Sequence, residues 1–146
     1  MGPRGSRLAA RAPVDLAWLV GQRLALPSHS HGLRVLVERA AARRGVPVNV
    51  VVEADSYRVL TSMVEEGIGH TILPPSAIYA EVQDGRLETA SFAGPGITRE
   101  LVLASPMEKA PSIAATAIAG LIRAEIRALI QEGRWAFRVE GDARPG

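Results

Sequence analysis

Blocks of hydrophobic and polar residues alternate along the chain and predict strands separated by helices. Short apolar or β-branched runs, typical of buried strands, lie at 23–27, 46–53 and 70–73. Apolar residues recur at helical spacing in 33–44 and again in 56–66, and glycine closes both segments, at Gly45 and Gly67. This strand–helix–strand–helix–strand order predicts a mostly parallel sheet with helices on both faces.

The apolar positions of each predicted helix indicate which face is buried. In the first helix they are Leu33, Leu36, Val37 and Ala40, and in the second Leu60, Met63 and Val64. The other predicted elements are a helical turn in 14–22, a short helix at 76–82, strands at 87–92 and 97–104, and a long helix at 112–131. Residues 1–13 are rich in Gly, Pro and Arg without a period, so we expect them to be flexible.

The long helix at 112–131 has an apolar stripe wider than one neighbour needs. The stripe consists of Ile118, Leu121, Ile122, Ile126, Leu129 and Ile130. A lobe of domain size is already complete at Ala104. We therefore expect the stripe to be more exposed than in a self-sufficient domain, or to be covered by another chain.

Composition and charge narrow the function classes. The chain has 146 residues, of which 47% are hydrophobic and 22% charged, enough for one soluble domain. The pI is near 9.7, but the net charge is only +2 and the arginines are scattered, which is weak support for DNA contact by this chain. The absence of cysteine excludes disulfides and thiolate chemistry. Because neither a signal peptide nor a membrane span is recognisable, we expect a cytoplasmic protein without membrane contact.

Polar loops follow the three predicted parallel strands and lead into helix N-termini. In open sheets of this kind, ligands bind outside the carboxyl ends of the strands, where free backbone N–H groups suit anions and carboxylates. The candidate ligand-binding residues in these loops are Ser28, His29, Ser30, Asp55, Ser56, Pro74 and Ser76. For Asp55 and Ser56 the alternative is simple capping of the following helix.

Other chemistries find weaker support. Gly67-Ile68-Gly69 follows a helix and precedes a strand, the reverse of a dinucleotide fingerprint. His29 and His31 stand two residues apart, yet a stable metal site needs three or four ligands, so we expect neither metal nor cofactor. A hydrolase would need Ser28 activated by His29 or His70 with Asp55, and the Gly-x-Ser-x-Gly elbow is absent.

Several motifs together resemble the effector-binding domain of LysR-type transcriptional regulators. They are Leu26-Pro27-Ser28 with Gly32-Leu33-Arg34, Glu53-Ala54-Asp55, Leu60 through Val64 to Gly67-Ile68-Gly69 and Leu73-Pro74, Gly85-Arg86-Leu87, and Arg99 to Ala104. The resemblance covers 15 to about 130, roughly four fifths of the chain. Within the family, the chain is similar to regulators of the nitrogen-assimilation control kind.

The resemblance implies a periplasmic-binding-protein-like (type II) α/β fold of two lobes with a small effector between them. Lobe two, a complete doubly wound unit of about five strands, would span 23–105, and the helix in 106–131 would return to an incomplete lobe one. Residues 1–22 would be a flexible remnant of lobe one and the hinge, and 132–146 a disordered tail. The family's N-terminal winged helix-turn-helix has no counterpart here, so the chain resembles a truncated regulator or a fragment.

The resemblance also implies a role. Effectors of family members contact positions that match Ser28 to Ser30 and Asp55 with Ser56, and the regulators self-associate through these domains. We therefore expect a sensor of a small polar or anionic metabolite that controls transcription and is not an enzyme, with DNA bound only through the domain missing here. The rivals are a solute-binding protein of the same fold and a small hydrolase.

Overall fold

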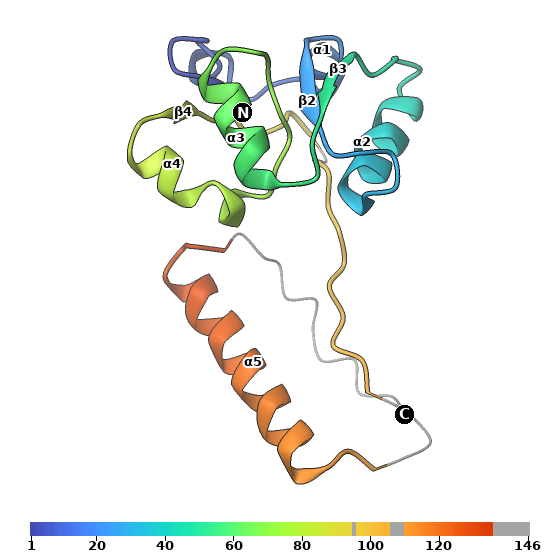
Figure 1. The fold of residues 1–146 in the computed structure, drawn as a ribbon, viewed down its shortest axis with the longest axis vertical. Coiled ribbons are helices and arrows are strands. Elements are labelled where there is room, and N and C mark those ends of the chain that lie inside the picture. Colours follow the sequence, from blue (N-terminus) through green and yellow to red (C-terminus); the bar gives the residue numbers. More distant parts are fainter. Residues whose placement is uncertain (95, 106–109, 136–146) are drawn as a thin grey trace. The chain divides into compact units, whose positions relative to one another are not determined.

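The computed structural model describes residues 1–94, 96–105 and 110–135 (Figure 1). The chain divides into two units, Met1–Glu100 and Leu101–Gly146. The first unit contains, in chain order, β1 (Gly2–Pro3), the 3-10 helix η1 (Ala9–Arg11), α1 (Leu16–Val20), β2 (Leu24–Leu26), α2 (Gly32–Ala42), β3 (Val50–Glu53), α3 (Tyr57–Glu65), the 3-10 helix η2 (Pro75–Ala77), α4 (Tyr79–Gln83) and β4 (Leu87–Glu88). The second unit contains α5 (Ile113–Gln131).

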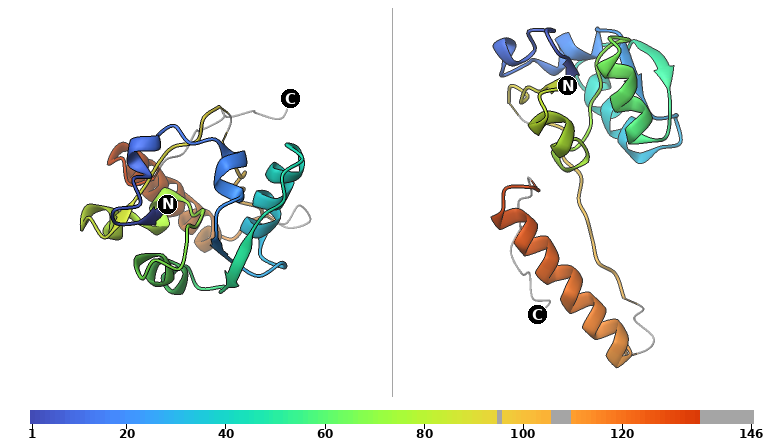
Figure 2. Two further views of the ribbon diagram at one scale, coloured as in Figure 1. Left: turned by 90° about the horizontal axis from the view of Figure 1, so that it is seen from above. Right: turned by 60° about the vertical axis from the view of Figure 1, so that its left-hand side comes forward.

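Parallel pairing of β2 with β3 forms the centre of the first unit. The register pairs Leu24 with Val50 and Leu26 with Glu53, so both strands end at the same edge. Figures 1 and 2 show α2 and α3 on opposite sides of this strand pair. The predicted α/β class and the parallel pairing of the first two strands are confirmed, although the second strand starts at Val50 rather than residue 46.

The third predicted strand, 70–73, is reduced to a bridge between His70 and Leu24 on the other side of β2. The backbone N–H of His70 donates to the carbonyl of Arg23, and the backbone carbonyl of His70 accepts from the N–H of Ala25, both at 2.8 Å. The next residue, Thr71, exchanges hydrogen bonds with the N-terminus, accepting from the Met1 amino group at 2.6 Å and donating to the Met1 carbonyl at 2.9 Å. The strand is thus shared between two partners and ends before Pro74.

Residues 1–13, which the sequence predicted to be flexible, instead contribute β1 to a second two-stranded sheet and Met1 and Leu8 to the core. β1 pairs antiparallel with β4, and Met1 and Leu8 are buried. The Glu88 carboxylate accepts the backbone N–H groups of Gly5 at 2.7 Å and Leu8 at 2.8 Å. These partners lie about 80 residues away in sequence, which is why a local pattern could not reveal them.

The last two predicted strands are also corrected. The run 87–92 contributes only β4 and an isolated bridge between Phe92 and Val14. The run 97–104 forms no strand among the described residues. The first unit therefore has less regular strand pairing than the five strands predicted for this lobe. One reason is that residues at the N-terminus pair with Thr71 and with β4.

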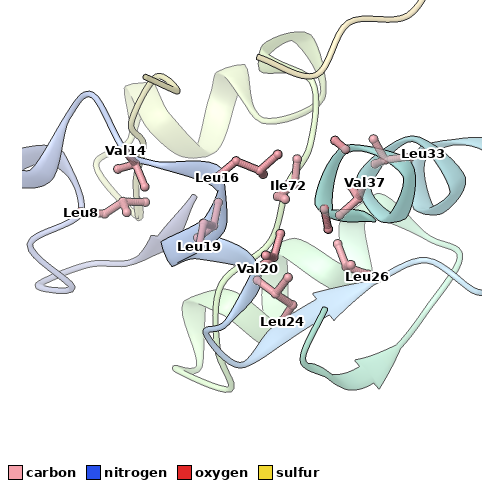
Figure 3. Close-up of a cluster of buried hydrophobic side chains, with 12 residues drawn as sticks. Leu8, Val14, Leu16, Leu19, Val20, Leu24, Leu26, Leu33, Val37 and Ile72 are labelled. Atoms are coloured by element: carbon pink, nitrogen blue, oxygen red, sulfur yellow. The ribbon is translucent and has the colours of Figure 1, made fainter. Parts of the chain in front are cut away.

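The main core lies between α1, β2 and α2 (Figure 3). Leu33, Val37 and Ala40 of α2 are buried as predicted, whereas Leu36 is only half-buried. On α3, Leu60 and Val64 are buried as predicted, but Thr61 rather than Met63 completes the buried face. Met63 instead lies beside an open groove.

Two glycines after α3 are required by geometry. Gly67 ends the helix with φ +78°, the left-handed conformation that glycine adopts without a steric cost. A Cβ on Gly69 would lie 2.3 Å from the carbonyl oxygen of Arg23, so only glycine lets this segment approach β2. The Gly67-Ile68-Gly69 motif is therefore a helix stop followed by a close backbone approach, as the order of its elements indicated.

The second unit is dominated by α5, which begins and ends where the sequence predicted. The Ser112 side chain caps it by accepting the Ala115 N–H at 3.1 Å. Within its own unit α5 has no buried residue, and Ile118, Leu121 and Ile122 are 57%, 70% and 40% exposed. Among the described residues no helix is both long and apolar enough to cross a membrane. Most of the predicted tail, from residue 136 onward, lies outside the described residues.

Candidate functional site

The loops after β2 and β3 are joined by one carboxylate. Asp55 Oδ1 accepts the backbone N–H of Ser28 at 2.9 Å and the Ser28 hydroxyl at 2.8 Å. The hydroxyl oxygens of Ser28 and Ser30 are 3.3 Å apart. Because the parallel register pairs Leu26 with Glu53, the residues that follow both strands are brought together. The structure thus assembles the predicted residues Ser28, Ser30 and Asp55 into one polar edge.

Asp55 is held in its ionised form at this edge. The backbone N–H of Ser28, followed by the Ser28 hydroxyl, lowers the pKa of the Asp55 carboxyl below its usual value. The side chain is exposed, and among the described residues no hydrogen bond reaches its second oxygen, Oδ2. Asp55 therefore offers solvent a fixed negative charge with one unoccupied oxygen.

The alternative role of Asp55 and Ser56, capping of the next helix, is not what the structure contains. Ser56 occupies the N-cap position of α3, but its side chain makes no capping hydrogen bond. Asp55 Oδ1 accepts from Ser28, and among the described residues neither Asp55 oxygen accepts a backbone N–H of α3. Both residues lie at the predicted edge, Asp55 as its connector and Ser56 as an exposed neighbour.

A buried arginine lies directly beneath the Ser28 loop. The side chain of Arg34 on α2 is 5% exposed and donates to three oxygen acceptors, and its Nη2 lies 3.3 Å from His29 Nε2. Its Nη1 donates to the Pro27 carbonyl at 3.1 Å and to Glu53 Oε1 at 2.9 Å, while its Nε donates to Glu38 Oε1 at 2.7 Å. A planar guanidinium suits such a convergent set, because its N–H groups point in fixed directions. Arg34 therefore fixes the chain where β2 passes into the loop.

The two loop histidines have different positions. His29 is 70% exposed, with ring nitrogens 3.2 Å from Glu38 and 3.7 Å from Glu53. His31 accepts the Leu33 N–H at 3.1 Å through Nδ1 and so caps α2, and its ring meets the edge of Tyr57. His29 is thus a largely solvated side chain beside two carboxylates, and His31 is a helix cap. His31 also occupies a backbone donor at the helix N-terminus that the sequence had assigned to an anionic ligand.

The third predicted loop does not join this edge. Among the described residues no hydrogen bond or ion pair connects Pro74 or Ser76 to the Ser28 or Asp55 loops. Ser76 lies within η2 and makes no capping hydrogen bond there. The strand before it forms only one bridge to β2, so this loop is not placed by a regular ladder.

The geometry bears on the rival chemistries. The Ser28 hydroxyl donates directly to Asp55, with no imidazole between them, and His70 lies instead in the bridge to Leu24 with its ring against Trp18. This differs from a triad, in which the base accepts the serine proton. Among the described residues no three His, Cys, Asp or Glu side chains are placed to hold a metal ion.

Arg34 and Glu38 are the site residues that the sequence reasoning did not select. Their signal was present, since an arginine and a glutamate four residues apart face one another on a helix. Arg34 also adjoins Leu33 on the apolar face, an unusual place for an unpaired cation. Those two features together would have indicated a buried ion cluster behind the loop.

Comparisons with known proteins identify the family of the chain. The LysR substrate binding domain matches residues 1–127. The chain is 30% identical over 135 residues to the HTH-type transcriptional regulator BbuR of Bordetella bronchiseptica, covering 92% of this chain and 42% of that protein. It is 32% identical over 127 residues to the uncharacterized HTH-type transcriptional regulator YfeR of Shigella flexneri, covering 87% and 41%. The chain thus spans about two fifths of the length of these relatives, and it belongs to the LysR substrate-binding-domain family.

Proposed function

We propose that this chain is the effector-sensing part of a transcriptional regulator and that it binds a small polar metabolite at the edge formed by Ser28, Ser30 and Asp55. The observation that carries the proposal is the hydrogen-bonded link between Ser28 and Asp55, which unites the ends of two parallel strands. The link leaves exposed hydroxyl and carboxylate oxygens on a backbone held by Arg34. Preorganised polar groups on strand ends are typical of ligand sites in α/β folds.

The charges at this edge favour a ligand with at least one hydrogen-bond donor or cationic group. The buried guanidinium of Arg34 is already neutralised by Glu38 and Glu53, whereas Asp55 is hydrogen-bonded to the uncharged Ser28. Asp55 Oδ2 is the acceptor that remains available. A ligand donor opposite that oxygen and a ligand acceptor opposite the Ser30 hydroxyl would complement the edge, as an amino acid or a hydroxy acid would. The proton of the Ser28 hydroxyl is already donated to Asp55.

In this proposal the Met1–Glu100 unit is the second lobe of a periplasmic-binding-protein-like fold, and Pro74 and Ser76 approach the ligand when the site is occupied. DNA would be bound by a helix-turn-helix domain of a longer polypeptide in the cytoplasm. The names of the two relatives support the regulatory role, because both are given as HTH-type transcriptional regulators. The direct contact of Ser28 with Asp55 supports a binding role for this serine over a nucleophilic one.

A thermal-shift screen tests the proposal. The full chain is heated with small carboxylates, inorganic anions, amino acids and diamines, and the midpoint of unfolding is measured for each. A ligand that binds only the folded state raises the midpoint, by an amount equivalent to about 2.7 kcal/mol at a concentration of 100 times its Kd. We expect compounds with a hydrogen-bond donor to give the largest rise.

Variants locate the response. Ser28→Ala and Asp55→Asn should each reduce the rise for the best compound, whereas Ser91→Ala, at an exposed serine whose side chain makes no hydrogen bond with the described residues, should leave it unchanged. Stabilisation that is equal in all three variants would place the ligand elsewhere. If no compound raises the midpoint of the unsubstituted chain, the binding role is wrong.

A further inference from the structure

An apolar cavity lies between residues 1–14, the N-terminal segment, and the rest of the first unit. Its volume is about 60 Å³. Only apolar residues line it, among them Met1, Leu8 and Val14 of the N-terminal segment, Leu19 of α1, and Ile72 and Phe92. Leu8, Val14, Leu19 and Ile72 are among the side chains labelled in Figure 3. The cavity shares no residue with the polar edge formed by Ser28, Ser30 and Asp55, so it is a separate feature of the fold.

Main-chain hydrogen bonds fix the walls of the cavity. The amino group of Met1 donates to the Thr71 carbonyl at 2.6 Å, and the Thr71 N–H donates back to the Met1 carbonyl at 2.9 Å. Val14 donates its N–H to the Ser91 carbonyl and accepts from the Ala93 N–H, both at 2.8 Å. Because these bonds hold the backbone on both sides, the walls cannot move together to fill the space without breaking them.

We propose that this cavity binds the short alkyl group of a small aliphatic molecule. Side chains that border a void lack dispersion partners on that side, and an alkyl group that enters supplies them while it leaves water. No charged side chain lines the cavity, so an ionic group would lose its hydration without compensation. Leu73, Ala90 and Phe92 line the cavity and are only half-buried, so the ligand would enter past these side chains.

The volume of the cavity limits the size of the ligand. A cavity of about 150 Å³ holds a benzene ring, whereas a water molecule takes a share of about 30 Å³ in the liquid. At about 60 Å³ the cavity is therefore too small for an aromatic ring and suits a chain of roughly two to four carbon atoms. So few atoms make few contacts, and we expect a dissociation constant on the order of 1–10 mM.

Binding in the cavity also holds the N-terminal segment more firmly. Met1, Leu8 and Val14 form one wall, so the segment cannot leave the first unit while the ligand stays in place. The backbone N–H groups of Val14 and Thr71 exchange their hydrogens with solvent only when their hydrogen bonds open. A ligand at ten times its dissociation constant should therefore slow this exchange about tenfold.

Titration of the isotopically labelled full chain with three alcohols tests the site. The probe n-propanol has a short alkyl chain, glycerol has the same number of carbon atoms but a hydroxyl on each, and benzyl alcohol carries an aromatic ring. We expect n-propanol to cause saturable amide chemical shifts at Leu8, Val14 and Ile72. Glycerol and benzyl alcohol should bind at least about tenfold more weakly, because one is too polar and the other too large.

Variants that change the volume locate the response. Ala90→Leu adds a branched alkyl group to the lining and should abolish the shifts caused by n-propanol, because the new side chain takes the space of the ligand. Ala80→Leu makes the same change at an exposed position of α4 and should leave the shifts intact. Leu8→Ala enlarges the cavity and should let benzyl alcohol bind. Circular dichroism checks that each variant is folded.

Three results would overturn the proposal. One is the absence of saturable shifts with n-propanol, or shifts that are equal in Ala90→Leu and in the unsubstituted chain. Another is an equal response to glycerol, which would show a general effect of the solvent. The third is a response to benzyl alcohol that does not rise in Leu8→Ala. Unchanged hydrogen exchange at Val14 and Thr71 in saturating n-propanol would contradict the coupling to the N-terminal segment.

Discussion

Replacement of Arg34 by methionine tests whether the ion cluster holds the Ser28 loop in place. The guanidinium is 5% exposed and donates to the Pro27 carbonyl, Glu53 and Glu38. Methionine has a similar volume but no donor. The substitution leaves a buried carbonyl without a partner and two carboxylates without a counter-charge.

The expected cost follows from these contacts. The buried Pro27 carbonyl loses its hydrogen-bond donor, which costs about 1 kcal/mol. Glu38 and Glu53 are 38% and 42% exposed, so water replaces part of each interaction and each loss costs roughly 0.5–1 kcal/mol, well below the value for a fully buried pair. The free energy of unfolding should therefore fall by about 2–3 kcal/mol.

Arg39→Met is the matched control, because Arg39 lies on the same helix, is exposed and makes no ion pair with the described residues. Its cost should stay below about 0.5 kcal/mol. Urea unfolding is followed through Trp18 fluorescence in a Trp135→Phe background, which reports on the Met1–Glu100 unit alone. The Arg34→Met midpoint should fall by about 1–2 M urea. If the two variants agree within 0.5 kcal/mol, the cluster contributes nothing to stability and the reasoning is wrong.

Two further predictions concern the remainder of the first unit. Gly69→Ala should lower the free energy of unfolding of this unit by about 3 kcal/mol in urea unfolding, because the added Cβ would lie 2.3 Å from the Arg23 carbonyl oxygen. Gly67→Ala should cost roughly 1 kcal/mol, because its Cβ would meet open space and only the backbone conformation, φ +78°, is unfavourable for alanine. Equal costs for the two variants would contradict the close approach at Gly69. The free energy of unfolding should fall as pH is lowered. Below about 8 the Met1 amino group contributes, because burial lowers its pKa to about 6, and below about 6.5 His70 adds to the fall, because burial lowers its pKa; only the His70 part should be lost in His70→Gln. Below about 4.5 Glu88 contributes, because the Gly5 N–H lowers the pKa of its carboxyl, and this part should shrink in Glu88→Gln. Unchanged pH profiles in both variants would refute these assignments.

The elements that could be predicted from sequence are those determined by local pattern. The helices α2, α3 and α5 follow from apolar residues at helical spacing, with a polar residue before the helix and a glycine or polar residue after it. β2 follows from a short apolar run and β3 from a β-branched run. Met63 shows the limit of this reasoning. It lies at helical spacing from Leu60, yet it borders the open groove, because nothing in the spacing tells which edge of an apolar stripe is covered.

The parts that could not be predicted depend on distant contacts. Met1 pairs with Thr71, and the Glu88 carboxylate accepts the backbone N–H of Gly5. The N-terminal segment is therefore held by residues that lie some 70 to 80 positions later in the sequence. At the candidate site, the parallel strand order predicted that the loops with Ser28 and Asp55 would lie at the same edge of the sheet. Which atoms they use was not predictable, because Asp55 had two competing partners, the helix that follows it and the loop beside it.

Amide chemical shifts of the isotopically labelled full chain, titrated with the best compound of the metabolite screen, show whether the edge formed by Ser28, Ser30 and Asp55 binds a ligand. We expect saturable shifts at these three residues, with the response lost in Asp55→Asn and kept in Ser91→Ala. Shifts confined to residues outside the β2 and β3 loops, or no shifts with any compound, would show that this edge does not bind the effector.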